Sequence, residues 1–360
     1  MEDWVINSVG KRVYDYTNLK GYISKLYGVS PRLISKDWGV HKLKFLRNLS
    51  PFKLGIKTAV VGDKGGRVVS YPPLGIEMIS KHLAKSFLEL GGEIILNAKV
   101  TAASCTQPEA GSPDRSSADI YVKYVSDEKE ASLKGDFLIS TIPVDELTRM
   151  LTPAPNEEVL KATTSLRYRT LITLFLCVNK EHVTKYGCVY FSEERFPFKR
   201  ISEFTNMSEK MAPVGKSSLC VEITCFNDDE ILRKDDKYIH DLVLTALEQE
   251  GFLHRTKVEK YKVLRISNAY PVYDLNYYEN LGKVFGYLST FNRVISIGRQ
   301  GLFSYNIMKN SLNSGLFVGK GLSTTDSSTW NQLIQERYSN RLEKYHHALR
   351  KADLRLGEVY

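Results

Sequence analysis

The stretch from residue 292 to residue 321 constrains the fold of this chain most strongly. A short apolar run, residues 294–297, predicts a strand that breaks at the glycine-paired turn of Gly298 and Gly301. Small and apolar residues then recur at helical spacing: Ile307, Leu312, Gly315, Leu316 and Gly319. A strand that opens into a helix in this way directs free backbone N–H groups and the positive helix end at one spot. The pattern favours a site for an anionic or electron-rich ligand, with Arg299 adding charge, although many such units are only connections.

The same stretch resembles the last segment of FAD flavoproteins in the amine oxidase, protoporphyrinogen oxidase and UDP-galactopyranose mutase superfamily. Further segments of the chain resemble other parts of these flavoproteins, in the same order and with similar spacing. They are residues 1–31, SYPPLGIEMISKHLAKSFLELGGEIILNAKV, FLISTIPVDEL, FPFKRISEFTNMS and NAYPVYDLNYYENL. The likeness covers roughly residues 2–322. It implies an α/β fold of two lobes, the FAD-linked oxidoreductase fold, with FAD as cofactor. One lobe binds the nucleotide and the other, built on an antiparallel sheet, binds the substrate.

One part of that pattern is missing from the sequence. Such flavoproteins begin with a βαβ unit whose G-x-G-x-x-G motif holds the ADP half of FAD. No such motif occurs here, and residues 61–67, VGDKGGR, lack its spacing, so we interpret them as a loop. The nucleotide-binding lobe is therefore expected to be incomplete. The sequence leaves three explanations open: a fragment, a short gene whose partner chain supplies the unit, or a degenerate homologue.

The resemblance and the hydrophobic patterns together predict the domain organisation. The nucleotide-binding lobe would come from residues 70–148 and 285–322, and the substrate lobe from 1–69 and 149–284. The patterns predict helices at 76–90, 144–150 and 235–250. They predict strands at 93–100, 120–125, 137–141, 171–178, 188–191, 199–204, 218–225 and 263–269. The segment between residues 125 and 137 is expected to be a loop.

Composition excludes several classes of function. The net charge of +9 is spread, with no block of five like charges, so nucleic-acid binding is not expected. A basic field does suit an anionic small-molecule substrate such as a nucleotide sugar. No apolar run is long enough to cross a membrane, and no signal peptide is visible, so we expect a cytoplasmic protein. The five cysteines lack metal-ligand spacing, and Cys177, Cys220 and Cys225 are expected to be buried free thiols.

For the cofactor, the resemblance implies contacts from the glycine turn and from two other segments. The candidates are Gly298, Arg299, Gly301, Tyr305, Thr141 and Gly75. Gly75 stands in the Tyr-Pro-Pro-Leu-Gly turn, which the sequence alone explains equally well as a plain turn. Thr141 ends a strand that passes near the cofactor in the relatives. No catalytic residue is assigned, because a flavin performs hydride chemistry itself.

For the substrate, the resemblance implies Arg200, Tyr270 and Tyr273. A guanidinium suits phosphate oxygens, and a tyrosine offers a stacking face and a phenol. The alternatives are a structural salt bridge for Arg200 and simple packing for the tyrosines. Two departures weaken a mutase interpretation: Tyr27 replaces the usual tryptophan, and Lys309 stands where relatives carry acidic or amide residues.

After residue 322 a polar linker leads to a predicted amphipathic helix at 330–351, within a last segment of residues 323–360. Its apolar stripe starts at Trp330 and its other faces are basic. It could dock on its own domain, bind a partner chain or bind an anionic membrane surface.

Three functions follow as hypotheses. The first is a FAD-dependent oxidoreductase acting on a small molecule, in glycan or secondary metabolism, once a nucleotide-binding unit completes it. The second is a nucleotide-sugar mutase, and the third is a homologue that does not bind FAD by itself.

Overall fold

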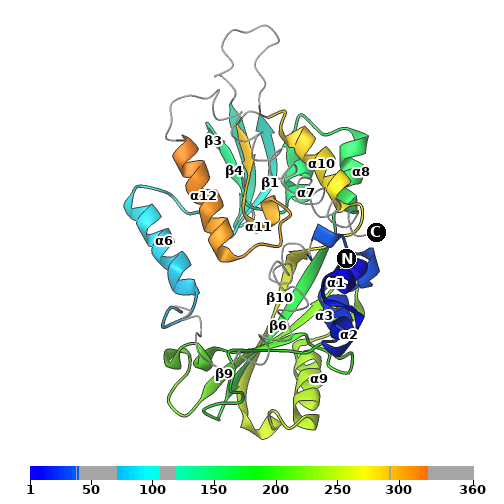
Figure 1. Cartoon of the computed structure of the whole chain (residues 1–360). Helices are drawn as coiled ribbons and strands as arrows, with labels where there is room; N and C mark the ends of the chain where they lie inside the picture. The colour runs from blue at the N-terminus through cyan, green and yellow to red at the C-terminus, as the bar shows by residue number, and fades with distance from the viewer. Residues whose placement is uncertain (38, 40–70, 106–118, 292, 323–360) are drawn as a thin grey trace. The chain divides into compact units, whose positions relative to one another are not determined.

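The computed structural model describes residues 1–37, 39, 71–105, 119–291 and 293–322 (Figure 1). The chain divides into two compact units, each discontinuous in sequence. Unit 1 comprises Met1–Ile94 and Tyr168–Leu275, and unit 2 comprises Ile95–Arg167 and Asn276–Tyr360. These boundaries differ from the expected ones. Residues 70–94 group with unit 1, and residues 149–167 and 276–284 group with unit 2.

The centre of unit 1 is a five-stranded sheet in the order β10-β6-β9-β8-β7. All its neighbouring strands are antiparallel. The strands are β6 (Tyr168–Val178), β7 (Cys188–Tyr190), β8 (Arg200–Glu203), β9 (Ser217–Cys225) and β10 (Val258–Pro271). The antiparallel sheet expected for a substrate lobe is therefore present.

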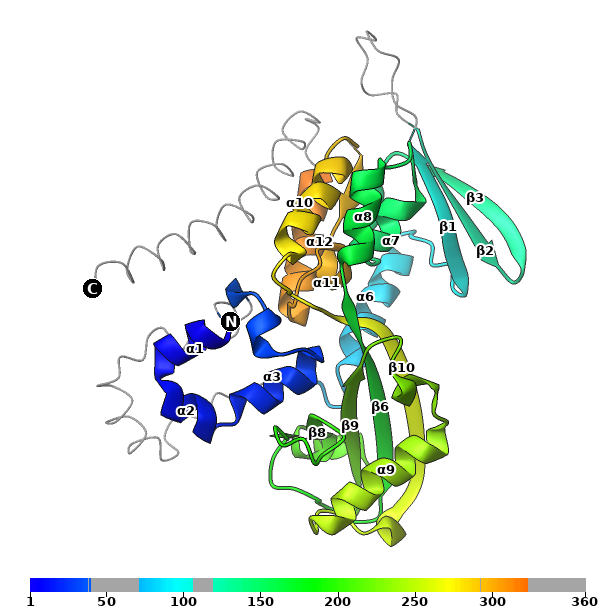
Figure 2. The same ribbon diagram turned by 90° about the vertical axis from the view of Figure 1, so that its right-hand side faces the viewer.

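One face of this sheet carries the core of unit 1, because alternate residues of a strand point to the same side. Leu174 of β6 and Val221 of β9 pair in register on that face and are fully buried. Helix α9 (Asp236–Gln249) lies along the same face, as Figure 2 shows, and contributes Val243 and Leu247. Burial of this apolar cluster is the main stabilising contribution to unit 1.

Residues 1–37 contain three short helices, α1 (Glu2–Val9), α2 (Lys11–Tyr16) and α3 (Leu19–Tyr27). The side chain of Asn18 caps the start of α3, and Gly28 ends it with a left-handed φ of 67°. The hydroxyl of Thr224 on β9 donates to the carbonyl of Lys25 at 2.7 Å. This bond fixes the end of α3 to the sheet.

Helix α6 (Glu77–Glu89) confirms the helix predicted at 76–90, but none of its residues is buried. Leu83 and Phe87, on its apolar stripe, are each 50% exposed. The described residues of unit 1 also contain five short 3-10 turns. They are η1 (Pro31–Leu33), η3 (Phe204–Asn206), η4 (Glu209–Met211), η5 (Glu230–Arg233) and η6 (Arg255–Lys257).

Unit 2 contains two smaller sheets. One has the order β3-β2-β1-β5, with β1 (Ala98–Cys105), β2 (Ile120–Ser126), β3 (Lys129–Gly135) and β5 (Leu151–Thr152). The other is the parallel pair of β4 (Leu138–Ser140) and β11 (Val294–Ser296). The helices are α7 (Val144–Met150), α8 (Glu157–Ser165), α10 (Tyr277–Leu288), α11 (Gly298–Gly301) and α12 (Met308–Leu322).

Most predicted elements are confirmed, with ends that shift by a few residues. Four predictions were wrong or incomplete. The strand predicted at 93–100 begins only at Ala98. The loop expected between residues 125 and 137 contains strand β3. All residues of β3 are exposed, so its sequence lacks the alternation of apolar and polar residues that predicts a strand. Helices α8 and α10 were missed. Two glycines and four aromatic residues give α10 a low helix propensity, and packing against α7 and α8 compensates. The predictions for residues 61–67 and 330–351 lie outside the described residues.

Candidate functional site

The second face of the unit 1 sheet, opposite α9, carries polar side chains within an otherwise apolar strand. Glu222 lies on this face in the middle of β9, and Arg200 of β8 is its register partner. A charge on a buried strand is costly unless it is paired. This face therefore concentrates the chemistry of unit 1.

Lys199, Arg200 and Glu222 form an ion cluster there. Lys199 Nζ donates to Glu222 Oε2 at 2.7 Å, and Arg200 donates to Oε1 through both Nε, at 3.0 Å, and Nη2. The side chains of Lys199 and Glu222 are 4% and 6% exposed, whereas that of Arg200 is 31% exposed. Two cations thus share one buried carboxylate, and the cluster carries an excess positive charge.

The protonation of this cluster reflects a competition between burial and pairing. Burial lowers the pKa of Lys199, and the Glu222 carboxylate only partly offsets it. Burial by itself raises the pKa of Glu222, but Lys199 and Arg200 together outweigh it and hold that pKa below its ordinary value. Glu222 is therefore ionised at neutral pH.

Tyr270 joins the cluster from β10. Its phenol oxygen accepts a hydrogen bond from Lys199 Nζ at 3.1 Å, and the same ammonium lies 4.6 Å from its ring centroid. The structure therefore brings together Arg200 and Tyr270, two of the three predicted substrate residues. Sequence reasoning missed Lys199 and Glu222, although a glutamate inside the apolar run SSLCVEITC was a signal for a buried charge.

Tyr273, the third predicted substrate residue, lies in a different environment. Its side chain is 4% exposed, and its carbonyl accepts a hydrogen bond from the Ser35 amide at 2.7 Å. The backbone of the next residue, Asp274, pairs with that of Ile34 in an isolated antiparallel β-bridge. These backbone contacts place Tyr273 beside the segment that follows α3, and its role toward a substrate stays a prediction.

Gly75 also belongs to unit 1. Its φ of 95° is one that side-chain-bearing residues rarely adopt, and its amide donates to the Pro72 carbonyl at 2.9 Å. A Cβ at this position would lie 3.2 Å from the Met211 methyl carbon. The glycine is thus needed for the turn itself, and its role beside a cofactor stays a prediction.

The glycine turn in unit 2 begins at the carboxyl ends of β4 and β11. The Ile297 amide donates to the Ser140 carbonyl at 2.8 Å, and Gly298 then turns with a φ of 81°. A Cβ on Gly298 would be 3.9 Å from Thr141. Two predicted cofactor residues from different strands therefore lie side by side at one sheet edge.

Gly301 allows a close approach in the same turn. A Cβ there would be 2.8 Å from Ser296 Oγ and 3.1 Å from the Ser140 carbonyl oxygen. The Ser296 hydroxyl donates to the Gly301 carbonyl at 2.7 Å.

The prediction that the turn opens directly into a helix with an apolar stripe needs correction. The turn residues form the one-turn helix α11, and residues 302–307 separate it from α12. Of the predicted apolar stripe, Ile307 and Leu316 are 60% and 63% exposed, and α12 buries Val318 instead.

Arg299 organises the connection that follows. Its Nη1 donates to the Asn306 carbonyl at 2.6 Å, and its guanidinium carbon lies 4.9 Å from the Tyr305 ring centroid. Gly298, Arg299, Gly301, Tyr305 and Thr141 are thus gathered in one small region of unit 2. Backbone N–H groups, a hydroxyl and a guanidinium at the carboxyl ends of parallel strands can hold an anionic ligand.

Comparison with known proteins identifies the fold. No protein-family model and no curated protein sequence matches the chain. Among solved structures, reduced UDP-galactopyranose mutase is similar, with a TM-score of 0.66 and 18% identity. A protoporphyrinogen oxidase candidate from Exiguobacterium sp. 255-15 is also similar, with a TM-score of 0.60 and 14% identity.

The chain has the FAD-linked oxidoreductase fold. Each similarity covers 84% of this chain, and the chain spans 62% of the length of each of those proteins. The fold expected from the sequence resemblance is confirmed.

Neither a metal-ligand cluster nor a membrane-spanning helix occurs among the described residues. Within these residues no group of three histidine, cysteine or acidic side chains could hold a metal ion. In the same part of the chain, no helix combines the length and apolar character needed to span a membrane. The donors gathered around Gly298 and Arg299 are of the kind that bind phosphate oxygens.

Proposed function

We propose that this protein is a FAD-dependent oxidoreductase-type flavoprotein that acts on a small molecule in glycan or secondary metabolism. The observation that carries the proposal is the turn at the carboxyl ends of β4 and β11. There Gly298 has a left-handed φ and lies next to Thr141, and Gly301 packs against both strands. Carboxyl ends of parallel strands are the usual ligand site in α/β folds.

In this proposal five residues of unit 2 hold FAD. The amides around Gly298 and Gly301 bind its oxygens, Arg299 supplies positive charge, and Thr141 adds a hydroxyl. Tyr305 offers an aromatic face that the Arg299 guanidinium orients. Gly75 is proposed as a further cofactor contact from unit 1. FAD itself supplies the hydride chemistry, and the protein binds and orients the reactants.

The substrate residues in this proposal are Arg200, Tyr270 and Tyr273. Arg200 is the exposed member of the ion cluster, and Glu222 holds its guanidinium in one orientation. A fixed guanidinium can bind a phosphate or carboxylate with two parallel hydrogen bonds. The excess positive charge of the cluster, which Lys199 supplies, favours an anionic substrate.

A nucleotide-sugar mutase is the second candidate. The similarity to UDP-galactopyranose mutase supports it, and so does the positive cluster around Arg200, which suits a diphosphate. Tyr27 and Lys309 depart from the mutase pattern and argue for a different substrate.

A third candidate is a protein that a partner chain completes before it can bind FAD. The parallel pair of β4 and β11 supports it, since parallel sheets are usually covered on both faces. Ile139 of β4 is 42% exposed, and Leu316 of α12 is 63% exposed.

The test is the visible absorption spectrum of the purified chain, before and after incubation with FAD and gel filtration. Bound flavin gives a yellow protein, and Arg299→Ala is expected to weaken FAD binding about tenfold, the value of one charge-assisted contact. The control is Lys161→Ala, which removes a charge from the exposed Lys161–Glu157 pair of the same unit. A colourless chain that takes up no FAD would contradict the proposal and favour the partner-completed alternative.

A further inference from the structure

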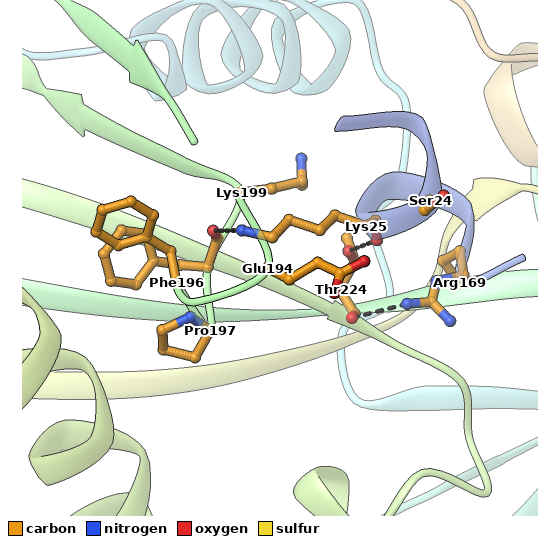
Figure 3. A pocket seen from close by; sticks show the side chains of 9 residues that line it. Ser24, Lys25, Arg169, Glu194, Phe196, Pro197, Lys199 and Thr224 are labelled. Atoms are coloured by element: carbon orange, nitrogen blue, oxygen red, sulfur yellow. Dashed lines mark hydrogen bonds between the residues drawn. The ribbon is translucent and has the colours of Figure 1, made fainter. Parts of the chain in front are cut away.

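A pocket of about 240 Å³ lies in unit 1 between the end of α3 and the loop before β8 (Figure 3). It is lined by Ser24 and Lys25 of α3, Arg169 of β6 and Thr224 of β9, together with Glu194 and residues 196–199. Pockets for whole drug-sized ligands measure roughly 300–1,000 Å³. This one is smaller and suits a single small group.

Lys25 is the distinctive feature of the pocket. Its Nζ donates to the carbonyl oxygens of Phe191 and Phe198 at 3.3 and 3.1 Å. An ammonium group has three donors, so one remains. Among the residues that the structure describes, no carboxylate forms a salt bridge with Lys25. Burial lowers the pKa of Lys25 to about 8, while the more distant charges of Glu193 and Glu194 act in the opposite direction.

Further positive charge surrounds this ammonium. Arg169 is 3% exposed, donates to the Thr224 carbonyl at 2.7 Å and forms an ion pair with Asp229 at 3.8 Å. Lys199 lines the pocket as well, although its own ammonium pairs with Glu222. A half-buried cation without a counter-ion is unfavourable, and an anion placed beside it removes that penalty.

We propose that this pocket binds a small anionic group, a phosphate or a carboxylate, with Lys25 as its principal ligand. Arg169 contributes buried charge, and the Ser24 hydroxyl contributes a polar contact, whereas the Thr224 hydroxyl already donates its proton to the Lys25 carbonyl. Its principal ligand, Lys25, is not among the residues proposed to hold FAD or substrate, although Lys199 both lines the pocket and belongs to the ion cluster. The site therefore stands or falls independently of the proposed function.

Glu194 sets the affinity of this site. It is the one carboxylate among the lining residues, its side chain is exposed, and it extends along the pocket in Figure 3. An incoming anion has to overcome the repulsion of Glu194. Replacing it with glutamine removes that repulsion while keeping the size of the side chain.

The experiment is isothermal titration calorimetry of the full chain with inorganic phosphate and, separately, with acetate, at constant ionic strength. We expect saturable binding, and the two titrations distinguish a phosphate site from a carboxylate site. Lys25→Met should weaken binding about tenfold or more, as expected for a lost charge-assisted hydrogen bond. Glu194→Gln should tighten it about threefold. Lys20→Met is the control, because it removes an exposed charge from the same helix.

Raising the pH supplies a second readout. The acetate affinity should fall between about pH 7 and about pH 9, because the Lys25 ammonium deprotonates there whereas acetate does not titrate. Glu193, Glu194, Arg169 and Lys199 are the charged groups near Lys25 in this range. Burial also lowers the pKa of Lys199, and Glu222 only partly offsets this, so any loss of charge at Lys199 would weaken acetate binding in the same direction.

Two results would overturn the site. One is the absence of saturable binding of either anion by the native chain and by Glu194→Gln. The other is equal binding by Lys25→Met and Lys20→Met. If Lys25→Met does not fold, since Lys25 also links α3 to two loop carbonyls, the Glu194→Gln titration and the pH profile decide. Anion binding by a chain that takes up no FAD would contradict the proposed function and leave this site intact.

Discussion

The sheet of unit 1 and the parallel strand pair of unit 2 differ in how completely they are buried. Leu174 and Val221, at the centre of the unit 1 sheet, have no exposed surface, and α9 covers their face. In unit 2, Ile139 of β4 is 42% exposed, and the fifteen-residue helix α12 buries only Val318. The unit 1 sheet thus has an apolar core that covers one face, whereas the β4–β11 pair is only partly covered.

This difference has an energetic consequence. Each apolar side chain that leaves water contributes roughly 1.5–3 kcal/mol, so the large cluster of unit 1 can stabilise its sheet alone. A pair of three-residue parallel strands cannot do so, because small isolated sheets are marginal in water. We infer that unit 1 is the more stable unit and that ligand binding or further burial stabilises unit 2. The predictions below test that ranking.

The largest effect is expected from Glu222→Gln in unit 1. The substitution leaves the buried Lys199 and the half-buried Arg200 without their carboxylate, and such a loss costs about 3 kcal/mol or more. Urea unfolding measures it. The control is Glu259→Gln, which breaks the partly exposed Lys216–Glu259 pair and should change stability by less than about 1 kcal/mol.

The pH dependence of this effect has a definite sign. The pKa of Glu222 is lowered in the folded protein, so its contribution is present at neutral pH and is lost as the pH falls through that lowered value. The stability difference between the native chain and Glu222→Gln should therefore narrow in acid. A difference that stays constant down to the acid-unfolding range would show that the charge of Glu222 is not what stabilises the cluster.

The fold was predictable where burial leaves a pattern in the sequence. The strands β6 and β9 were found because their apolar residues are dense and bounded by polar turns. Strand β3 was missed because pairing with β2 holds it while all its side chains stay exposed. Helix α10 was missed because tertiary packing, rather than propensity, determines it.

The candidate site was predictable in part for a related reason. Arg200 and Tyr270 were found through family resemblance, which marks single positions. The carboxylate that links them, Glu222, lies opposite Arg200 because of the register between β8 and β9. This register cannot be read from the sequence. Lys25 was missed because its burial, without a salt bridge to any described carboxylate, becomes visible only once α3 is docked on β9.

The second prediction tests the packing density of unit 1 with Gly28→Ala. A Cβ there would lie 2.1 Å from an Arg169 nitrogen and 2.7 Å from the Phe226 ring. Arg169 cannot move freely because it is bonded to Thr224 and stacked on Phe226. We expect a loss of about 2–3 kcal/mol, the sum of backbone strain and overpacking.

Gly251→Ala is the matched control for this change. Gly251 has a φ of 68°, almost the same as the 67° of Gly28, but nothing within 4 Å of its Cβ position. It should lose only the strain of about 1 kcal/mol, measured by the same urea unfolding. Equal losses for the two variants would mean that the Arg169 region is loosely packed.

The third prediction carries the same test into unit 2 with Gly301→Ala. The added methyl would meet Ser296 Oγ and the Ser140 carbonyl, and we expect a loss of about 1–2 kcal/mol, smaller than for Gly28→Ala. Under the proposed function it should also reduce FAD uptake. Gly315→Ala, on α12 with nothing within 4 Å, should be neutral or slightly stabilising. A loss at Gly301 that exceeds the loss at Gly28 would reverse the ranking of the two units.

The last prediction compares how fast the thiols of the two units react with a labelling reagent, which requires no substitution in either unit. One expectation from the sequence was wrong: Cys177 is exposed, whereas Cys220 and Cys225 are buried as predicted. Burial raises the pKa of Cys220 to about 12 and that of Cys225 to about 11, and it also raises the pKa of Cys105 in unit 2.

In the native protein, a maleimide or iodoacetamide should therefore label Cys177 first, since the thiolate is the reactive form and exposure admits the reagent. The partly exposed Cys188 should follow. Among the three buried thiols, Cys105 should react first, because a less complete core opens more often, and Cys220 and Cys225 should react last. Peptide mass spectrometry at timed intervals gives the order, with labelling in urea as the reference for full exposure. Labelling of Cys220 or Cys225 before Cys105 would show that the sheet of unit 1 opens more readily than unit 2, and the ranking inferred from their cores would fail.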